Sequence, residues 1–314
     1  MKRTEVDDYS PPWERAVPDG LYKDLSSRAY HDGPAISKSG LDLIHRSPAH
    51  FKLGVDERRE QWTNREFVQP PAAYRLGSLA HTAILEPDKL NDEYRIIPSD
   101  INKRTKAGKA EFAEWMAENS EFTHVTQEEI ATTAAMKEAV LGSKDAQILL
   151  GNPKAPSDLY GGDSVLTESS VYWHEGGVQC RCRPDVWHVD EGILVDFKTT
   201  VDASPKAFAK SVLRYRYHVQ AGFYLLGTGP GSVVGGDIPD ARAFYIVAVE
   251  KTPPFGVAVY HMSQEYIDIG RREALNDLAQ YESCVTDNYW PSYNHQICTL
   301  TPPAWMAQQE DSND

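Results

Sequence analysis

The chain has 314 residues, a formal net charge of −14 and 41% hydrophobic residues. This length and composition are sufficient for a buried core in one large domain or two, and the acidic excess excludes a protein whose whole surface binds nucleic acid through nonspecific positive charge. Because the sequence contains no apolar run long enough to cross a membrane and begins with no signal-peptide pattern, we expect a cytoplasmic protein.

The first half of the chain is predicted to be mainly helical after a flexible arm. Residues 1–19 are polar and rich in proline, whereas 20–150 contains several helical patterns. The pattern over 75–85 has an apolar stripe, and His81 falls on a different face that is free to meet another element. A lone histidine on a helix is more often a surface residue, so a functional role for His81 needs support from elsewhere.

Two helix starts in this half carry further signals. Thr126, followed three residues later by Glu129, predicts a helix that begins with a capping box. Ser37 and Lys38 precede a helical run near 39–45, and a helix N-terminus with hydroxyl groups can bind a phosphate. Ordinary N-capping explains these two residues at least equally well.

Basic residues are concentrated in two places. The densest cluster consists of Lys103, Arg104, Lys106 and Lys109. The second group flanks the strands described next and consists of Arg181, Arg183, Arg214 and Arg216. Such runs are usually just solvated faces, and they become candidate contacts for a DNA backbone only where another motif gives reason to expect phosphates.

Strands are predicted to dominate from 164 to 200. Glu168 lies on the first of them, 164–174, where an exposed strand carboxylate is the slightly favoured interpretation and an additional metal ligand is the alternative. Residues 178–189 and 193–199 flank a turn at 190–192 and predict a hairpin.

This hairpin would bring Asp185 and Asp196 together from opposite arms. Side chains alternate along a strand, so Asp196 and Lys198 share one face while Phe197 points into apolar packing. An Asp-x-Lys sequence is often a chance ion pair, but Asp196 stands in an apolar strand where an unpaired carboxylate is costly. Two clustered carboxylates need a cation, and a lysine beside a Mg²⁺ site is typical of phosphodiester hydrolysis.

A long helix over 206–226 is predicted to follow the hairpin. Gln220 and Tyr224 lie four residues apart and share one face with Tyr217. This polar stripe could lie over the hairpin and hold a phosphate or the attacking water. Tyrosines that form the amphipathic edge of the core are an equally good interpretation.

The sequence up to this point resembles a known family. The Pro184-Asp185 pair, Asp196-x-Lys198 and the later Gln220-x-x-x-Tyr224 are similar to the motifs of PD-(D/E)xK nucleases of the RecB-like branch. Within that branch the chain is most similar to the C-terminal nuclease domains of the exonuclease VIII (RecE) type. The matching segments cover nearly the whole chain and include 20–22, 30–39, 76–81, 102–109, 168–173, 180–185, 196–200 and 215–220.

The resemblance implies a fold class and a domain organisation. The expected fold is α/β, with a PD-(D/E)xK (restriction-endonuclease-like) core in which helices flank a central mixed β-sheet, and with an added N-terminal helical part. A single exonuclease domain would span 20–307, with 20–150 as its mainly helical part and 160–300 as its catalytic core. Residues 308–314 are expected to be a disordered tail.

The resemblance also implies roles for individual residues. Asp185, Asp196, His81 and the backbone carbonyl of Phe197 would bind Mg²⁺, for which Mn²⁺ would substitute. Lys198 would position or activate the attacking water. Gln220 and Tyr224 would belong to the catalytic group. Contacts to DNA are expected from Ser37, Lys38, Lys103, Arg104, Lys106, Lys109 and Arg216.

The implied activity is a Mg²⁺-dependent exodeoxyribonuclease that degrades linear double-stranded DNA from 5′ to 3′ and leaves 3′ single-stranded overhangs for recombination by strand annealing. The expected partners are DNA ends and a RecT-like single-strand annealing protein. A ring-like homo-oligomer such as a tetramer, encoded by a phage or prophage, is also implied. An endonuclease with the same site and a non-catalytic DNA-binding protein remain the alternatives.

Overall fold

The computed structural model describes residues 17–23, 25–64, 68–151, 164–232, 239–293 and 297–302. Most of the predicted N-terminal arm and the predicted tail at 308–314 lie outside the described residues. The predicted domain boundaries therefore stay predictions.

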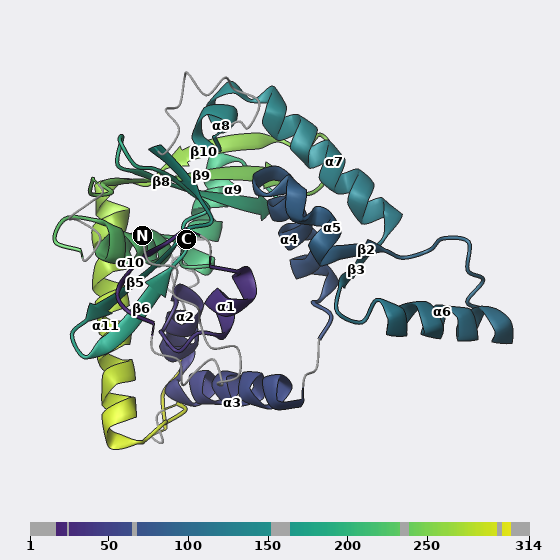
Figure 1. Ribbon diagram of the computed structural model, residues 1–314. Coiled ribbons are helices and arrows are strands. Elements are labelled where there is room, and N and C mark those ends of the chain that lie inside the picture. Colours follow the sequence, from purple (N-terminus) through teal and green to yellow (C-terminus); the bar gives the residue numbers. More distant parts are fainter. Residues whose placement is uncertain are drawn as a thin grey trace, which may run out of the picture.

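A five-stranded mixed sheet forms the centre of the molecule (Figure 1). Its strand order is β10-β9-β8-β7-β4, with β8 and β9 parallel and the other neighbours antiparallel. The strands are β4 (Val165–Thr167), β7 (Val186–His188), β8 (Ile193–Thr200), β9 (Ala243–Glu250) and β10 (Val257–His261). Strand β8, which carries the predicted Asp-x-Lys motif, thus lies in the middle of the sheet.

Helices cover both faces of this sheet, as Figure 1 shows. The helices on one face are α4 (Ala72–Leu85), α7 (Gln127–Gly142) and α8 (Lys144–Leu149). Those on the other face are α9 (Pro205–Arg214), α10 (Tyr217–Thr228) and α11 (Gln264–Asp287). Helices α10 and α11 cross so closely that a Cβ at Gly222 would clash with the backbone of Arg271, and one at Gly270 would clash with that of His218.

The side chains of β8 alternate between the two layers. Leu194 packs in the hydrophobic cluster with α9, α10 and α11, whereas Val195 and Phe197 pack in the cluster with α4, α7 and α8. Asp196 and Lys198 lie on the same face of the strand as Leu194. The predicted alternation along this strand is confirmed, and it directs both charged side chains toward α10.

Two smaller sheets and the remaining helices complete the fold. One antiparallel sheet has the order β1-β5-β6 and consists of β1 (Gly20–Tyr22), β5 (Ser170–Glu175) and β6 (Val178–Cys182). The N-terminal helices α1 (Ser27–Asp32), α2 (Lys38–Arg46) and α3 (Pro48–Asn64) lie near this sheet and α11. The other sheet is a parallel pair, β2 (Tyr94–Ile96) and β3 (Thr123–Val125).

One part of the chain projects from the body of the molecule. Helix α6 (Lys106–Glu118) extends away from the central sheet in Figure 1, beyond the β2–β3 pair. The connection from α4 to this region runs through η2 (Pro87–Lys89) and α5 (Leu90–Glu93). Helix α6 has a side-chain cap at its start, because the hydroxyl of Thr105 accepts a hydrogen bond from the amide of Gly108.

Several sequence-based predictions of local structure are confirmed and others are wrong. The capping box is present, with reciprocal hydrogen bonds between Thr126 and Glu129. The prediction of one long helix over 206–226 is wrong, because this segment forms two helices, α9 and α10. Arg216 separates them in a left-handed conformation with φ of 53°. The predicted strand over 178–189 is two strands, because β6 belongs to a different sheet from β7.

The arrangement confirms the predicted fold class, an α/β fold with a central mixed sheet flanked by helices and a mainly helical N-terminal part. Among the described residues no helix combines the length and apolar character needed to span a bilayer.

Candidate active site

The β7–β8 hairpin brings the two predicted aspartates together. Val186 lies opposite Val195 in the antiparallel ladder, so Asp185 stands at the end of β7 across from Asp196. The connecting turn contains Gly192, whose φ is 66° and where a Cβ would press on the backbone of Asp240. The Oδ2 atom of Asp185 accepts a hydrogen bond from the amide of Phe197 at 2.6 Å. This bond fixes the first aspartate against the strand that carries the second.

Asp196 is the most deeply buried carboxylate of the site, with an exposed fraction of 1%. Its Oδ1 accepts a hydrogen bond from Nε2 of Gln220 at 2.5 Å, and its Oδ2 lies 2.5 Å from Nζ of Lys198. Burial raises the pKa of Asp196 to about 6, even though the Lys198 ammonium opposes that rise. For Lys198, burial would lower the pKa, but Asp196 and Asp185 outweigh it and raise the pKa above its ordinary value. Lys198 is therefore an ammonium ion at neutral pH.

His81 completes a cluster with two carboxylates. Its Nε2 lies 3.2 Å from Oδ1 of Asp185 and 3.3 Å from Oε1 of Glu168. One nitrogen or oxygen atom from each of the three residues lies within 4.8 Å of the other two. Burial would lower the pKa of His81, but Asp185 and Glu168 outweigh it and raise that pKa to about 9. In turn His81 and Lys198 hold the pKa of Asp185 below its ordinary value, against the effect of burial.

Glu168 reaches the cluster through a break between two strands. The residue lies between β4 and β5 with φ of 52°, a left-handed conformation that ends the strand predicted over 164–174. Its side chain is 12% exposed, so the slightly favoured interpretation of an exposed strand carboxylate is wrong. Burial and the nearby Asp185 raise the pKa of Glu168 to about 8.

Arg183 fixes the position of Glu168. Its Nε lies 2.9 Å from Oε2 of Glu168 and donates to the backbone carbonyl of the same residue at 2.8 Å. Its Nη2 donates to the carbonyl of Leu25 at 2.6 Å. Because the Arg183 side chain is only 7% exposed, it acts as a buried support for Glu168 and not as a surface contact for DNA.

The three residues of the predicted polar stripe on α10 have different surroundings. Gln220 contacts Asp196, as described above, and the ring of Tyr217 lies 5.2 Å from Nζ of Lys198. Tyr224 is 8% exposed and packs edge-on against Phe244, with ring centroids 6.1 Å apart. Gln220 and Tyr217 thus border the site, whereas the contacts of Tyr224 are those of a core residue.

The predicted DNA contacts are distributed over distant parts of the molecule. Lys38 lies near the site, with its Nζ 6.0 Å from the Tyr217 ring, but it also pairs with Asp42 at 2.6 Å. Ser37 occupies the N-cap position of α2, and its hydroxyl contacts that of Ser39 at 3.0 Å instead of making a capping bond. The basic cluster Lys103, Arg104, Lys106 and Lys109 lies at the start of α6, far from the hairpin in Figure 1.

Arg216 is not an exposed cation. Its guanidinium pairs with Asp42 at 3.1 Å, Glu273 at 3.3 Å and Asp277 at 2.6 Å, and its side chain is 11% exposed. These ion pairs connect α2, the start of α10 and α11. An arginine that already pairs with three carboxylates is poorly placed to contact a phosphate, and the predicted DNA contact of Arg216 stays a prediction.

Comparison with known proteins assigns the fold to a family. A family model described as a PDDEXK-like domain of unknown function (DUF3799) matches residues 37–301. The chain belongs to this PDDEXK-like family. The match includes His81, Glu168, Asp185, Asp196 and Lys198, so all of the clustered side chains lie within the family's domain.

One solved structure shares the fold over most of the chain. A crystal structure of a candidate exonuclease from Eubacterium rectale aligns over 90% of this chain and 97% of the other, with 12% sequence identity and a TM-score of 0.55. At this identity the likeness shows the fold alone. The crystal structure of SSO0001 aligns over 68% of this chain and 96% of the other at 14% identity, but its TM-score of 0.27 carries no inference. No curated protein matches the sequence.

The donor set of this PDDEXK-like site fits a divalent cation. Carboxylate oxygens with one imidazole nitrogen suit Mg²⁺ or Mn²⁺. Two buried acceptors in the group, Oε1 of Glu168 and Oδ2 of Asp196, each have only an ion-pair contact, to His81 and to Lys198 respectively. The compact cluster contains Glu168, predicted as a possible additional ligand, with His81 and Asp185, whereas both oxygens of Asp196 are already engaged by Gln220 and Lys198.

One residue of the site, Arg183, was not assigned its role from the sequence, and Glu168 was given its role only as the alternative interpretation. The alternation around Glu168 predicts a regular strand and gives no sign of the left-handed break that turns its side chain inward. Arg183 was interpreted as part of a basic group. The signal that could have revealed this role is the position of Arg183 between Cys182 and Pro184. The segment is apolar, and a buried arginine there requires a carboxylate partner.

Proposed function

We propose that the protein is a Mg²⁺-dependent nuclease that hydrolyses phosphodiester bonds in DNA, and more narrowly an exodeoxyribonuclease. The observation that carries this proposal is the convergence of Asp185, Asp196 and Lys198 with His81 and Glu168 at one buried point. A DNA-binding module without chemistry has no need to gather three carboxylates, a histidine and a lysine below its surface, where each charge is costly to bury.

The residues around this point can take different roles in hydrolysis. When bound, Mg²⁺ would supply Lewis-acid stabilisation of the developing negative charge and lower the pKa of a coordinated water. His81, Glu168 and Asp185 would hold the ion, with Asp196 and the Phe197 carbonyl as further ligands. Arg183 and Gln220 keep Glu168 and Asp196 oriented through the bonds described above.

Lys198 is best suited to orient the attacking water and to stabilise negative charge. Because Asp196 and Asp185 raise the pKa of its amine, Lys198 is an ammonium ion in the metal-free site. This ammonium can donate hydrogen bonds next to the reacting phosphate, where preorganised donors lower the barrier most. The ring of Tyr217 lies 5.2 Å from the ammonium and borders it.

The finer features of the activity follow from the family resemblance. We infer degradation of linear duplex DNA from 5′ to 3′, with 3′ overhangs available to a RecT-like annealing protein, by a ring-shaped homo-oligomer such as a tetramer in the cytoplasm of a phage-carrying bacterium. Similarity to RecE nuclease domains in the segments given above supports these features. The description of the Eubacterium rectale protein as a candidate exonuclease supports cleavage from an end, whereas the direction rests on the RecE resemblance alone.

The test is a time course with linear duplex DNA labelled at its 5′ or its 3′ ends, with and without Mg²⁺, beside a covalently closed circle. The proposal predicts Mg²⁺-dependent release of label from the 5′ ends first, and an intact circle. Cutting of the circle would identify an endonuclease. No cleavage with Mg²⁺ or Mn²⁺ would identify a non-catalytic DNA-binding protein.

A further inference from the structure

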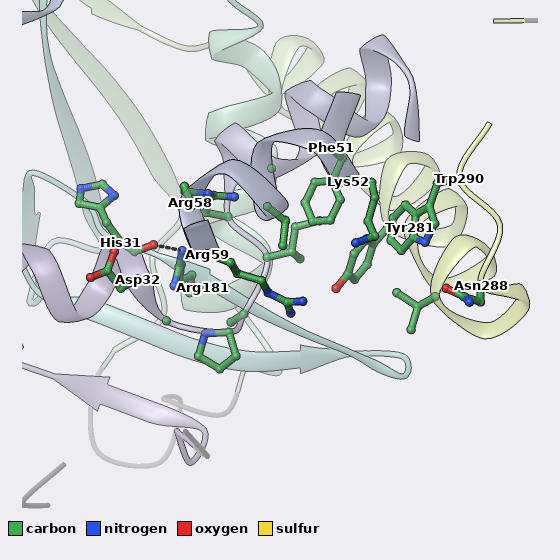
Figure 2. Close-up of a pocket in the computed structure, with 18 residues that line it drawn as sticks. His31, Asp32, Phe51, Lys52, Arg58, Arg59, Arg181, Tyr281, Asn288 and Trp290 are labelled. Carbon is green, nitrogen blue, oxygen red and sulfur yellow. Dashed lines mark hydrogen bonds between the residues drawn. The ribbon is translucent and has the colours of Figure 1, made fainter. Parts of the chain in front are cut away.

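The structure contains a cavity separate from the carboxylate cluster. It has a volume of about 430 Å³ and lies between the α1–α2 connection, α3, β6 and the end of α11. Pockets for small ligands have volumes of roughly 300–1,000 Å³, so this cavity is large enough for a nucleotide-sized group. Figure 2 shows its lining residues, and we call it the arginine pocket.

One end of the arginine pocket is strongly cationic. Arg58, Arg59 and Arg181 line it, with Lys52 nearby and Asp32 as the one carboxylate among the lining residues that the structure describes. This concentration is unusual for a chain with a net charge of −14. Burial and the repulsion from the neighbouring Arg181 lower the pKa of Arg58, and Asp32 only partly opposes this. An anion placed between them would relieve this repulsion.

Arg181 supplies a built donor at this end. Its side chain is 3% exposed and its Nη2 donates to the carbonyl of His31 at 2.9 Å. Its Nε makes no hydrogen bond among the described residues. A buried N–H group without a partner costs free energy, and a negative charge in the adjoining pocket would offset part of that cost through its attraction to the guanidinium. This buried cation distinguishes the arginine end from an ordinary solvated basic surface.

The other end of the arginine pocket is aromatic. Phe51 stacks on Trp290 with ring centroids 5.7 Å apart and an interplanar angle of 15°. Tyr281 meets Phe51 edge-on at 5.1 Å. Tyr281 and Trp290 are half-buried and, with Val285, form the wall opposite the arginines (Figure 2). Cationic groups beside aromatic rings are the combination with which proteins bind single-stranded nucleic acid.

We propose that the arginine pocket binds one nucleotide unit of single-stranded DNA, with a phosphate toward Arg58, Arg59 and Arg181 and the unstacked base against Tyr281 and Trp290. This inference rests on the proposed nuclease function, because that function supplies single strands at the neighbouring site. The two sites adjoin at the start of α2, where Ser37 lines the pocket and Lys38 lies over the Tyr217 ring beside Lys198.

The arginines also connect the arginine pocket to the carboxylate cluster. The guanidinium carbons of Arg181 and Arg183 lie 5.0 Å and 5.3 Å from the centroid of the Tyr30 ring. Arg181 lines the pocket, whereas Arg183 holds Glu168 at the cluster. The pocket and the carboxylate cluster therefore share a buried wall formed by Tyr30 and these two arginines.

The test measures binding of a fluorescein-labelled oligothymidylate to the full chain in EDTA, where the carboxylate cluster holds no metal. The variants are the double substitution Arg58→Ala with Arg59→Ala, and Trp290→Ala. The matched control is Arg272→Ala, which removes an exposed arginine of α11 that does not line the pocket. Thermal unfolding of each variant verifies the fold, and Trp290→Leu replaces Trp290→Ala if the latter unfolds.

We expect the double arginine variant to weaken binding about tenfold and to reduce its salt dependence, and Arg272→Ala to leave both unchanged. Trp290→Ala should weaken binding of the oligothymidylate about tenfold but leave binding of an abasic strand of equal length unaltered. Excess thymidine monophosphate should compete with the oligothymidylate, and its failure to compete would count against a pocket for one nucleotide unit.

Two results would overturn the proposal. Binding that is unchanged in both pocket variants would remove the pocket from strand recognition, and polyglutamate that competes as well as the oligothymidylate would identify an acidic-peptide site. Neither result affects the nuclease proposal, which the Mg²⁺-dependent cleavage of duplex DNA tests separately. Conversely, absence of cleavage with intact binding would refute the nuclease proposal and leave the pocket in place.

Discussion

Two networks of charged side chains meet α10, and they differ in how completely their charges are paired. At the start of the helix, Arg216 pairs with Asp42, Glu273 and Asp277, and the two oxygens of Asp277 are taken by Arg216 and His45. Asp42 and Glu273 also reach solvent, with side chains 36% and 35% exposed. This network leaves its carboxylates satisfied, and its role is to join three helices.

The second network, along the same helix, contains Asp196 with Asp185 and Glu168. These carboxylate side chains are between 2% and 12% exposed, and burial raises the pKa of Asp196 to about 6 and that of Glu168 to about 8 despite the nearby cations. Carboxylates in this state are costly to ionise unless a further cation joins them. The comparison teaches that a network whose carboxylates are saturated by cations and solvent supports the fold, whereas one whose buried carboxylates lack positive charge can bind a metal ion. The following changes test that distinction.

The largest expected effect is on cleavage. Lys198→Ala should lower the rate of DNA cleavage by about 10²- to 10⁴-fold, because it removes the ammonium beside the reacting phosphate. DNA binding should remain, since the change leaves the basic surfaces intact. End-labelled duplex and a filter-binding assay measure both quantities, with Lys144→Ala, an exposed lysine of α8, as the control. Equal cleavage by Lys198→Ala and the wild type would refute the role of Lys198.

The next largest effect concerns the saturated network. Arg216→Met should reduce the free energy of unfolding by about 3 kcal/mol, because the change leaves Asp277 buried without its cation. The value lies at the lower end of the range for buried pairs, since Asp42 and Glu273 can turn to solvent. Urea denaturation measures the loss, and Arg214→Met, at an exposed arginine two residues earlier, should change stability little. If the Arg216→Met variant folds but no longer binds Mn²⁺, the two networks are not separate.

A smaller effect is expected where α10 contacts the site. Gln220→Leu removes the donor to Oδ1 of Asp196 and leaves this buried oxygen without a hydrogen bond, which costs about 1–3 kcal/mol. We expect cleavage to fall about tenfold at saturating metal. Gln220→Glu should be more harmful, because it places a second carboxylate against Asp196 and raises the pKa of that residue further. Cleavage rates of the two variants, measured side by side, decide this order, and equal rates would contradict it.

The smallest effect is outside both networks, at the capping box of α7. Burial raises the pKa of Glu129, but hydrogen bonds and charge from Arg75 and the Thr126 amide outweigh this and hold that pKa below its ordinary value of 4.5. The unfolded state therefore binds more protons, so the stabilisation is present above pH 4.5 and is lost as the pH falls through the folded pKa.

Glu129→Gln retains the capping geometry and removes the charge. We expect a loss of about 0.5–1 kcal/mol at neutral pH, because the partly exposed ion pair with Arg75 is screened by solvent. The difference between variant and wild type should disappear in acid. Urea denaturation at neutral and acidic pH measures it. A difference that stayed constant with pH would show that the charge of Glu129 does not contribute.

The hairpin with its two aspartates could be predicted from sequence because its signals are local. Alternation and a short turn place Asp185 opposite Asp196, and the same alternation separates Lys198 from Phe197. The capping box at Thr126 is equally local. These features depend on spacing within a few residues, and the structure reproduces them.

The features that sequence reasoning missed depend on contacts between distant segments. Glu168 enters the site through a left-handed residue between two strands, and no periodicity signals such a break. The division of the helix over 206–226 at Arg216 is similar, because the apolar pattern continues across it. Arg216 itself was predicted to contact DNA, and its ion pairs become visible only when α2 and α11 are placed beside it.

The most direct test of the central claim measures Mn²⁺ binding and DNA cleavage in the same samples, for the wild type and for Asp185→Asn. Electron paramagnetic resonance gives the bound metal, and a 5′-labelled linear duplex gives the cleavage rate. We predict that cleavage by the wild type rises with bound Mn²⁺ and that Asp185→Asn loses both. Cleavage by Asp185→Asn at the wild-type rate, or cleavage by the wild type in EDTA, would contradict the assignment of a metal-dependent nuclease site to this cluster.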